Sequence, residues 1–202
     1  MQERRVPKFD NLNPKSRLTR IILSITLLTY LVAEGVPAVA SAMMLRADVF
    51  HTHHYWTFLT PMLLHGGLWH LFANMVFLWT YGPVLEGFLG PRRFLGLYLF
   101  AGFTGYLLSW FGNCYLQGGY WGGIGASGAL FGFDGAFLAL YLRWRMLSWE
   151  QIRGLTQWAA FFLVGGFALE ANGFSYLDNF AHLGGLVGGF LLTVALPRPR
   201  GR

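Results

Sequence analysis

Residues 181–196 read AHLGGLVGGFLLTVAL, a segment without Asp, Glu, Lys or Arg. Small residues recur in it every four positions, at Ala181, Gly185 and Gly189. This spacing predicts a helix with a stripe of small residues along one face, where a second backbone can approach closely. Such stripes are typical of helices that pack against each other inside a membrane.

A second apolar segment, residues 127–142 (SGALFGFDGAFLALYL), carries a matching pair of small residues at Gly128 and Gly132. The chain contains 27 glycines, and these two lie inside an apolar segment rather than in a linker. We therefore expect the two segments to be membrane helices that pack together through their small residues.

The composition supports a membrane protein. The chain has 202 residues, of which 54% are hydrophobic, 18% aromatic and only 12% charged, whereas soluble domains carry about 25% charged residues. The 19 Phe and 8 Trp argue against disorder, and a single cysteine excludes a disulfide scaffold.

Six apolar segments predict an all-α membrane protein, a compact bundle of six transmembrane helices in one domain, residues 21–197. The expected spans are 21–40, 68–85, 94–111, 127–142, 155–171 and 181–196. A helix needs about 17–25 residues to cross a bilayer, so the fourth and sixth spans are near or below that limit.

The charges predict the orientation. Of the 15 Lys and Arg residues, only Arg46 falls on one side of the expected membrane. The others fall on the opposite side: Arg4, Arg5, Lys8, Lys15, Arg17, Arg20, Arg92, Arg93, Arg143, Arg145, Arg153, Arg198, Arg200 and Arg202. Basic loops face the cytoplasm, so residues 1–20 and the tail 198–202 are expected there, and no nucleic-acid partner is needed to explain the charge.

The N-terminal segment has an alternative interpretation as a signal peptide, because the small residues 38–42 (AVASA) follow an apolar stretch. That stretch is longer than the usual 7–15 residues of a signal sequence. We therefore expect the first helix to be retained.

Three polar clusters open three of the expected spans, all at the external side. The first contains His65, His70 and Asn74, of which the last two share one helix face. Polar side chains at membrane depth are costly and often functional. The alternative is interfacial histidines with an asparagine that bonds a neighbouring helix.

The second cluster is Gly125-Ala126-Ser127-Gly128. A serine at a helix start is commonly an N-cap. The same position also offers backbone N–H groups and a positive dipole end, which stabilise the oxyanion formed when a serine attacks a carbonyl.

The third cluster centres on His182, which lies at the start of residues 181–196, the segment with the stripe of small residues. If the two stripes pack together, His182 meets Ser127 and its neutral imidazole can take the serine proton. A histidine at the start of a packing helix is the alternative. A serine hydrolase site accounts for all three clusters together.

The three motifs resemble the rhomboid family of intramembrane serine proteases, in its minimal six-helix bacterial type. The resemblance covers nearly all of residues 56–189 and rests on His65-xxxx-His70-xxx-Asn74, Gly-x-Ser127-Gly and Ala-His182-xx-Gly-xxx-Gly. It implies a multi-pass protein of the bacterial inner membrane that cleaves transmembrane protein substrates among membrane lipids, without a cofactor or metal.

By this resemblance Ser127 is the nucleophile and His182 its base, without a catalytic acid. Asn74, His70 and the Ser127 backbone N–H would hold the oxyanion. His65, Gly125, Gly128 and Phe131 would support the cavity, while the packing residues are Ala181, Gly185, Gly189 and Gly132. The resemblance also implies a structural Glu86, a mobile fifth helix and a cap made by the loop of residues 172–179.

Two positions depart from the family pattern. The pair Trp56-Thr57 lacks the Arg that the family often has, which concerns the anchoring of the external loop. Phe131 stands where the family frequently has Tyr, which keeps the ring and removes the hydroxyl.

The fourth span has 16 residues, about 24 Å of helix against about 30 Å of hydrocarbon. With Arg143 and Arg145 at the inner surface, Ser127 should lie below the outer one. Hydrolysis there requires a water-filled cavity, which His65, His70 and Asn74 can line. A substrate helix must enter sideways and unwind.

Four further features carry weaker expectations. His51, His53 and His54 lack a full zinc ligand set, so no metal is expected. We expect Asp178 to be a solvated loop carboxylate rather than a partner of His182. Glu34 and Glu170 fall near external helix ends.

Asp134 lies two helical turns below Ser127, on nearly the same face, too deep to reach the dyad. We expect it to be protonated and to donate a hydrogen bond to a neighbouring helix.

The main alternative function is a non-catalytic membrane scaffold or chaperone with a rhomboid-like fold, which would need neither Ser127 nor His182. A transporter would require an inverted repeat or an interrupted helix, neither of which the sequence contains.

Overall fold

The computed structural model describes residues 16–116, 123–172 and 177–198, and within them it is helical throughout, without a strand. The long helices are α1 (Arg17–Gly35), α4 (Leu68–Leu89), α5 (Pro91–Ser109), α6 (Ser127–Leu142), α7 (Trp149–Ala171) and α8 (Asn179–Ala195). The short elements are α2 (Pro37–Met43), α3 (Val49–Thr52), the 3₁₀ turns η1 (Tyr55–Phe58) and η2 (Thr60–Leu63), and the π-helix η3 (Trp110–Leu116). The expected all-α membrane bundle is confirmed.

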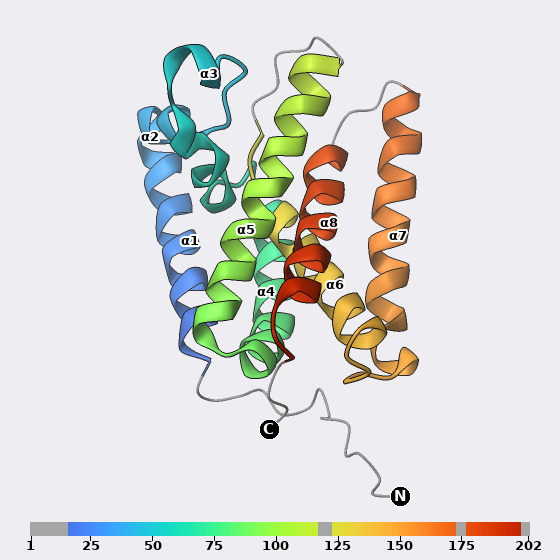
Figure 1. Cartoon of the computed structure of the whole chain (residues 1–202). Helices are drawn as coiled ribbons and strands as arrows, with labels where there is room; N and C mark the ends of the chain where they lie inside the picture. Colours follow the sequence, from blue (N-terminus) through green and yellow to red (C-terminus); the bar gives the residue numbers. More distant parts are fainter. Residues whose placement is uncertain (1–15, 117–122, 173–176, 199–202) are drawn as a thin grey trace, which may run out of the picture.

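The long helices run alternately up and down, so the start of α1 and the end of α8 lie at the same end of the bundle (Figure 1). α5, α6 and α8 form its centre, and the most extensive packing is between α6 and α8. α1 lies at one edge and α7 at the other, where α7 makes few contacts with α6 and α8 (Figure 1).

The stripes of small residues on α6 and α8 face each other. A Cβ at Gly185 would overlap the carbonyl oxygen of Gly128, and one at Gly189 would overlap that of Gly132. A Cβ at Gly128 would lie 3.2 Å from the carbonyl oxygen of Ala181. Glycine at these positions therefore lets the two backbones touch.

α8 has a second glycine face that the sequence interpretation did not include. Gly184 and Gly188 pack against Thr104 of α5, where a Cβ on either would overlap its atoms. α8 is thus held between α5 and α6 with almost no side chain in between.

Three helices are long and apolar enough to cross a membrane, namely α1, α7 and α5 together with its continuation η3. α6 and α8 are shorter apolar helices. α4 has 22 residues but is not among the three, because polar side chains such as His70, Asn74 and Glu86 lower its mean hydropathy.

Several helices differ in length from the expected spans. The first helix ends at Gly35 rather than at residue 40, since Val36 leaves the helical conformation and Pro37 starts α2. α4 continues to Leu89 through Pro83, and α7 begins at Trp149, six residues before expected. α6 spans residues 127–142, as expected.

Glu86 ties the C-terminal end of α4 to the start of α1. Its carboxylate accepts hydrogen bonds from the backbone N–H of Leu18 (3.1 Å), the N–H of Thr19 (2.9 Å) and the Thr19 hydroxyl (2.9 Å). These N–H groups lie in the first helical turn and have no partner within the helix, so the carboxylate acts as a cap. Gly82 leaves the space that Thr19 occupies.

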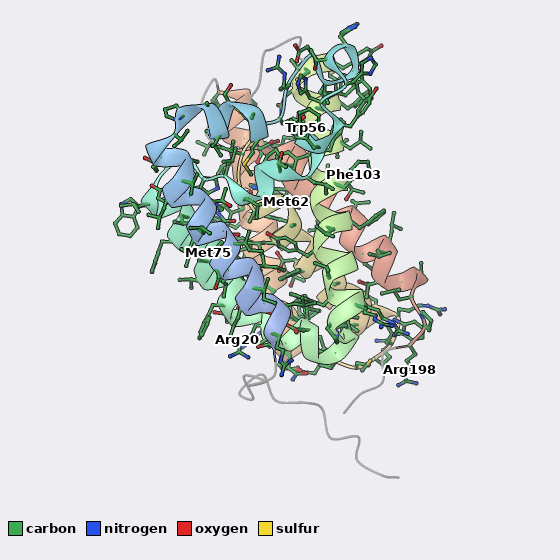
Figure 2. The ribbon with its side chains drawn as sticks, turned by 90° about the vertical axis from the view of Figure 1, so that its left-hand side faces the viewer. Arg20, Trp56, Met62, Met75, Phe103 and Arg198 are labelled. Atoms are coloured by element: carbon green, nitrogen blue, oxygen red, sulfur yellow. The ribbon has the colours of Figure 1, made fainter. Side chains whose placement is uncertain are left out.

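Most of the described arginines belong to segments at the end of the bundle where α1 begins and α8 ends. Arg20 and Arg198 lie there, whereas Trp56 lies at the opposite end (Figure 2). Arg4, Arg5, Lys8, Lys15, Arg200 and Arg202 lie outside the described residues.

The segment between α1 and α4 is anchored at the opposite end without the family's arginine. Thr57 is fully buried and its hydroxyl donates to the His54 carbonyl (2.7 Å). The indole of Trp56 donates to the Ala42 carbonyl (2.9 Å), and Arg46 forms an ion pair with Asp48 (2.8 Å). That ion pair lowers the pKa of Asp48 below its usual value.

Candidate active site

Ser127 and His182 meet inside the bundle. Oγ of Ser127 lies 2.9 Å from Nε2 of His182, although the residues are 55 positions apart. Ser127 is the first residue of α6, and His182 lies in the first turn of α8. The contact between Gly128 and Ala181 brings these two helix starts together.

The ring of His182 is oriented by packing. It stacks on Phe131, one turn after Ser127, with ring centroids 4.2 Å apart and planes 12° from parallel. His182 is 4% exposed, and its Nδ1 has no hydrogen-bond partner among the described residues. No carboxylate therefore takes the place of the acid in a catalytic triad.

Asp178 is not the solvated loop carboxylate that we expected. It caps α8, where its Oδ1 accepts from the backbone N–H of Ala181 (3.0 Å). The hydroxyl of Ser109 donates to Oδ2 (2.5 Å) and the amide of Asn113 to Oδ1 (3.3 Å). Asp178 thus ties the helix start that carries His182 to the end of α5 and to η3.

His70 lies beside Ser127 because Gly125 makes room for it. Gly125 has a φ of +121°, and a Cβ there would come within 2.8 Å of Nε2 of His70. The Gly125 backbone is fixed by its N–H to the Pro61 carbonyl (2.9 Å) and by the Tyr106 hydroxyl, which donates to its carbonyl (2.6 Å). Sequence reasoning missed Tyr106, which no motif indicated.

The tautomer of His70 follows from its neighbours. The backbone N–H of Gly66 donates to Nδ1 of His70 over 3.4 Å, a long hydrogen bond. Nδ1 is then the acceptor, so Nε2 carries the proton in the neutral ring. Nε2 faces Gly125 and can act as a donor.

Asn74 and His70 lie one turn apart on α4. The amide nitrogen of Asn74 donates to the carbonyl oxygen of His70 (2.8 Å), and the residue is 6% exposed. The Asn74 amide has two N–H groups, and only one of them is used in the hydrogen bond to His70. The second N–H group can therefore donate to another acceptor.

His65 lies in the turn before α4, behind His70, and their ring centroids are 5.0 Å apart. It is not among the described residues that line the cavity. Burial, with the neighbouring His70, lowers the pKa of His65 to about 3, so its ring is neutral at physiological pH.

A cavity of about 190 Å³ opens beside Ser127. Four polar side chains line it together with apolar ones from α4, α6 and α7. The lining residues are His70, Ala73, Asn74, Phe77, Ser127, Leu130, Phe131, Trp158, Phe162, Leu177 and His182. It is large enough for water and for a small side chain.

Trp158 of α7 forms the side of this cavity. Its ring centroid lies 5.1 Å from that of Phe131 and 5.1 Å from that of Phe77 on α4. Aromatic contacts therefore close the gap between α4 and α7.

Asp134 is buried below the dyad, with 3% of its surface exposed. Neither carboxyl oxygen has a hydrogen-bond partner among the described residues. The expected hydrogen bond to a neighbouring helix is therefore wrong.

Within the described residues no group of three or more His, Cys, Asp or Glu side chains is placed to hold a metal ion. His53 instead bonds the Tyr55 hydroxyl (2.9 Å), and His54 packs on Trp56. Glu34 lies in the last turn of α1. The side chain of Glu170 and residues 173–176 of the expected cap lie outside the described part.

The fold and the site together define an all-helical membrane protein with a serine–histidine pair in a buried cavity. The Rhomboid domain family matches residues 52–199, and the chain belongs to this family.

Its relatives include proteins from bacteria and plants. The rhomboid protease GluP of Bacillus subtilis is 38% identical over 146 residues, which cover 72% of this chain and 27% of GluP. RHOMBOID-like protein 1 of Arabidopsis thaliana is 40% identical over 154 residues, 75% of this chain and 37% of the relative. RHOMBOID-like protein 5 of Arabidopsis thaliana is 32% identical over 173 residues, which cover 84% of this chain and 53% of the relative. The chain thus matches about a quarter to half the length of these relatives.

Proposed function

We propose that this protein is an intramembrane serine protease that hydrolyses a peptide bond in or near the transmembrane segment of a membrane-protein substrate. The observation that carries the proposal is the 2.9 Å contact between Ser127 Oγ and His182 Nε2 in the helix bundle. The family membership and the relative named a rhomboid protease support it.

The geometry suits a two-step acyl transfer. Oγ of Ser127 attacks the substrate carbonyl carbon while Nε2 of His182 takes the hydroxyl proton. The imidazolium then gives that proton to the leaving amine as the C–N bond breaks, which leaves an ester on Ser127. Water, deprotonated by His182, hydrolyses the ester and restores both residues.

The oxyanion would form where donors converge. The start of α6 supplies the Ser127 N–H and the positive end of the helix dipole. His70 and Asn74, each with an N–H group available to donate, line the same cavity as Ser127. Such donors stabilise the negative charge of the tetrahedral intermediate.

Access would come from the side between α4 and α7. α7 packs loosely, and Trp158 closes the gap through ring contacts alone. A displacement of α7 would open a path from the lipid to Ser127.

The orientation of the protein in the membrane is part of the same proposal. The start of α1 and the end of α8 lie at one end of the bundle together with Arg20 and Arg198 (Figures 1 and 2), which supports a cytoplasmic position for both termini. Ser127 then opens toward the outside of a bacterial inner membrane.

The test is covalent labelling of the purified protein with a fluorophosphonate, which reacts with an activated serine. We expect the label on Ser127 of the wild type, and its absence in Ser127→Ala and His182→Ala. Ser148→Ala is the matched control, since this serine lies between α6 and α7, and it should label normally. A folded wild-type protein that takes no label would favour the non-catalytic scaffold.

A further inference from the structure

A groove of about 520 Å³ runs along the outside of the bundle between α5 and α8, away from the cavity at Ser127. Apolar side chains and glycines line it, among them Phe100 and Leu108 of α5 and Val187 and Leu191 of α8. Phe100, Val187 and Leu191 are 41%, 43% and 57% exposed. The groove exists because Gly184 and Gly188 bring the two helices together without side chains to fill the surface between them.

The groove has the length of one membrane leaflet. Its lining residues on α8 run from Leu183 to Ala195, which is about 18 Å along a helix. Half of a hydrocarbon core of about 30 Å is about 15 Å. The groove thus matches one acyl chain, and Ala195, the last residue of α8, marks the end where a headgroup would lie.

Three arginines lie close to that end in the sequence, and one of them contacts the segment that follows α8. The guanidinium of Arg93 donates to the carbonyl of Pro197 (3.3 Å), which holds it beside the last turn of α8. Arg92 and Arg198 are exposed nearby in the sequence, and Arg198 projects from this end of the molecule (Figure 2). Among the described residues no ion pair involves these three arginines.

One turn from Arg93, the surface is open. A Cβ at Gly96 would meet no atom within 4 Å. Gly96 lies between Arg93 and Phe100 on one face of α5, at spacings of three and four residues. The surface of α5 between Arg93 and the groove is therefore open at Gly96.

We propose that this groove binds an anionic phospholipid, with one acyl chain between α5 and α8 and the phosphate at Arg92, Arg93 and Arg198. The three positive charges favour a headgroup with net negative charge, because a zwitterionic lipid would bring its own cation to the same site. A protein helix would fill the groove but would offer no phosphate to the guanidinium groups.

The proposal is tested by native mass spectrometry of the purified chain in detergent with an equimolar mixture of phosphatidylglycerol and phosphatidylcholine of identical acyl chains. We expect the wild type to retain phosphatidylglycerol preferentially. The double variant Arg92→Gln/Arg93→Gln should lose that preference by about fivefold for each arginine. The control Arg143→Gln/Arg145→Gln removes the same charge where the guanidinium groups lie over Trp144 and Tyr141, and it should keep the preference.

A second pair of variants tests the groove itself. Val187→Trp places a bulky ring in the groove and should reduce retention of the lipid. Val32→Trp is the control, since Val32 is similarly exposed (42%) but lies on α1. Equal retention of the two lipids by the wild type, or an equal loss in both arginine variants, would overturn the proposal. A dimer abolished by Val187→Trp would instead assign the groove to a second copy of the chain.

Discussion

The imidazole of His182 lies flat on Phe131 and has no partner at Nδ1 among the described residues. Ring stacking thus takes over the orienting role that a carboxylate has in a catalytic triad. The replacement of the family's frequent Tyr by Phe131 preserves this contact, because stacking depends on the face of the ring and not on the hydroxyl.

Phe131→Ala should therefore lower kcat by up to about tenfold with little change in KM, since an aromatic pair contributes about 0.5–1.5 kcal/mol beyond burial. Steady-state cleavage of a transmembrane substrate in detergent measures both constants. Phe131→Tyr keeps the ring and should retain the wild-type kcat. An unchanged kcat in Phe131→Ala would show that stacking does not position His182.

The buried side chain of Asp134 leads to a prediction about the thermal stability of the protein. A buried carboxyl without a partner costs the free energy of its lost hydration, about 1–3 kcal/mol. Asp134→Leu, which has a similar branched shape, should raise the melting temperature by a few degrees. Asp134→Asn should change it little, because the amide is buried in the same way.

The melting temperatures of the wild type, Asp134→Leu and Asp134→Asn, measured in one detergent, test this prediction. A lower melting temperature for Asp134→Leu would mean that the carboxyl is satisfied in the folded protein, for example by a bound water. Fluorophosphonate labelling of Ser127 should persist in both variants, which separates stability from chemistry.

At the scale of the element, the start of α8 is tied down by Asp178, which receives hydrogen bonds from Ala181, Ser109 and Asn113. Asp178→Ala removes this cap and should slow the labelling of Ser127 by about fivefold, from a cap contribution of about 1 kcal/mol. Asp178→Asn keeps an oxygen acceptor for the Ala181 N–H and should label at nearly the wild-type rate.

The labelling rate at a saturating probe concentration, measured well below the melting temperature of each variant, separates positioning from unfolding. Glu34→Ala, which removes a carboxylate from the end of α1, is the control. If Asp178→Ala unfolds earlier but labels normally, the cap stabilises the helix without positioning His182.

The helix pairing could be predicted from the sequence because it depends on a periodic pattern. Glycines every four residues on 127–142 and 181–196 indicate a close contact, and this contact brings Ser127 to His182. The all-helical membrane class followed from composition in the same way.

Features that depend on contacts between distant segments could not be predicted. Nothing in the sequence pairs Tyr106 with the Gly125 carbonyl, or Ser109 with Asp178, because each contact joins two segments whose relative position the local sequence does not define. The missing partner of Asp134 was unpredictable for the same reason, because it depends on which side chains of other helices come near it.

For the whole molecule, the alternating helices (Figure 1) and the position of Arg20 and Arg198 at one end (Figure 2) support the proposed orientation. Single cysteines at Asn172 should react with an impermeant thiol reagent added outside intact cells, whereas cysteines at Arg93 and Arg153 should react only after permeabilisation. The native Cys114 is first replaced by alanine. The reverse pattern would place the site toward the cytoplasm. Gly119, the other external position suited to this experiment, lies outside the described residues.

The proposed reaction depends on the whole bundle bringing two helix starts together. Its most direct test is the rate of cleavage of a transmembrane substrate in liposomes by the wild type, Ser127→Ala, His182→Ala and the double variant. We predict that each single variant loses cleavage and that the double variant is no slower than either, because the two residues act as one unit. Cleavage by folded Ser127→Ala above the uncatalysed rate would contradict the assignment of Ser127 as the nucleophile.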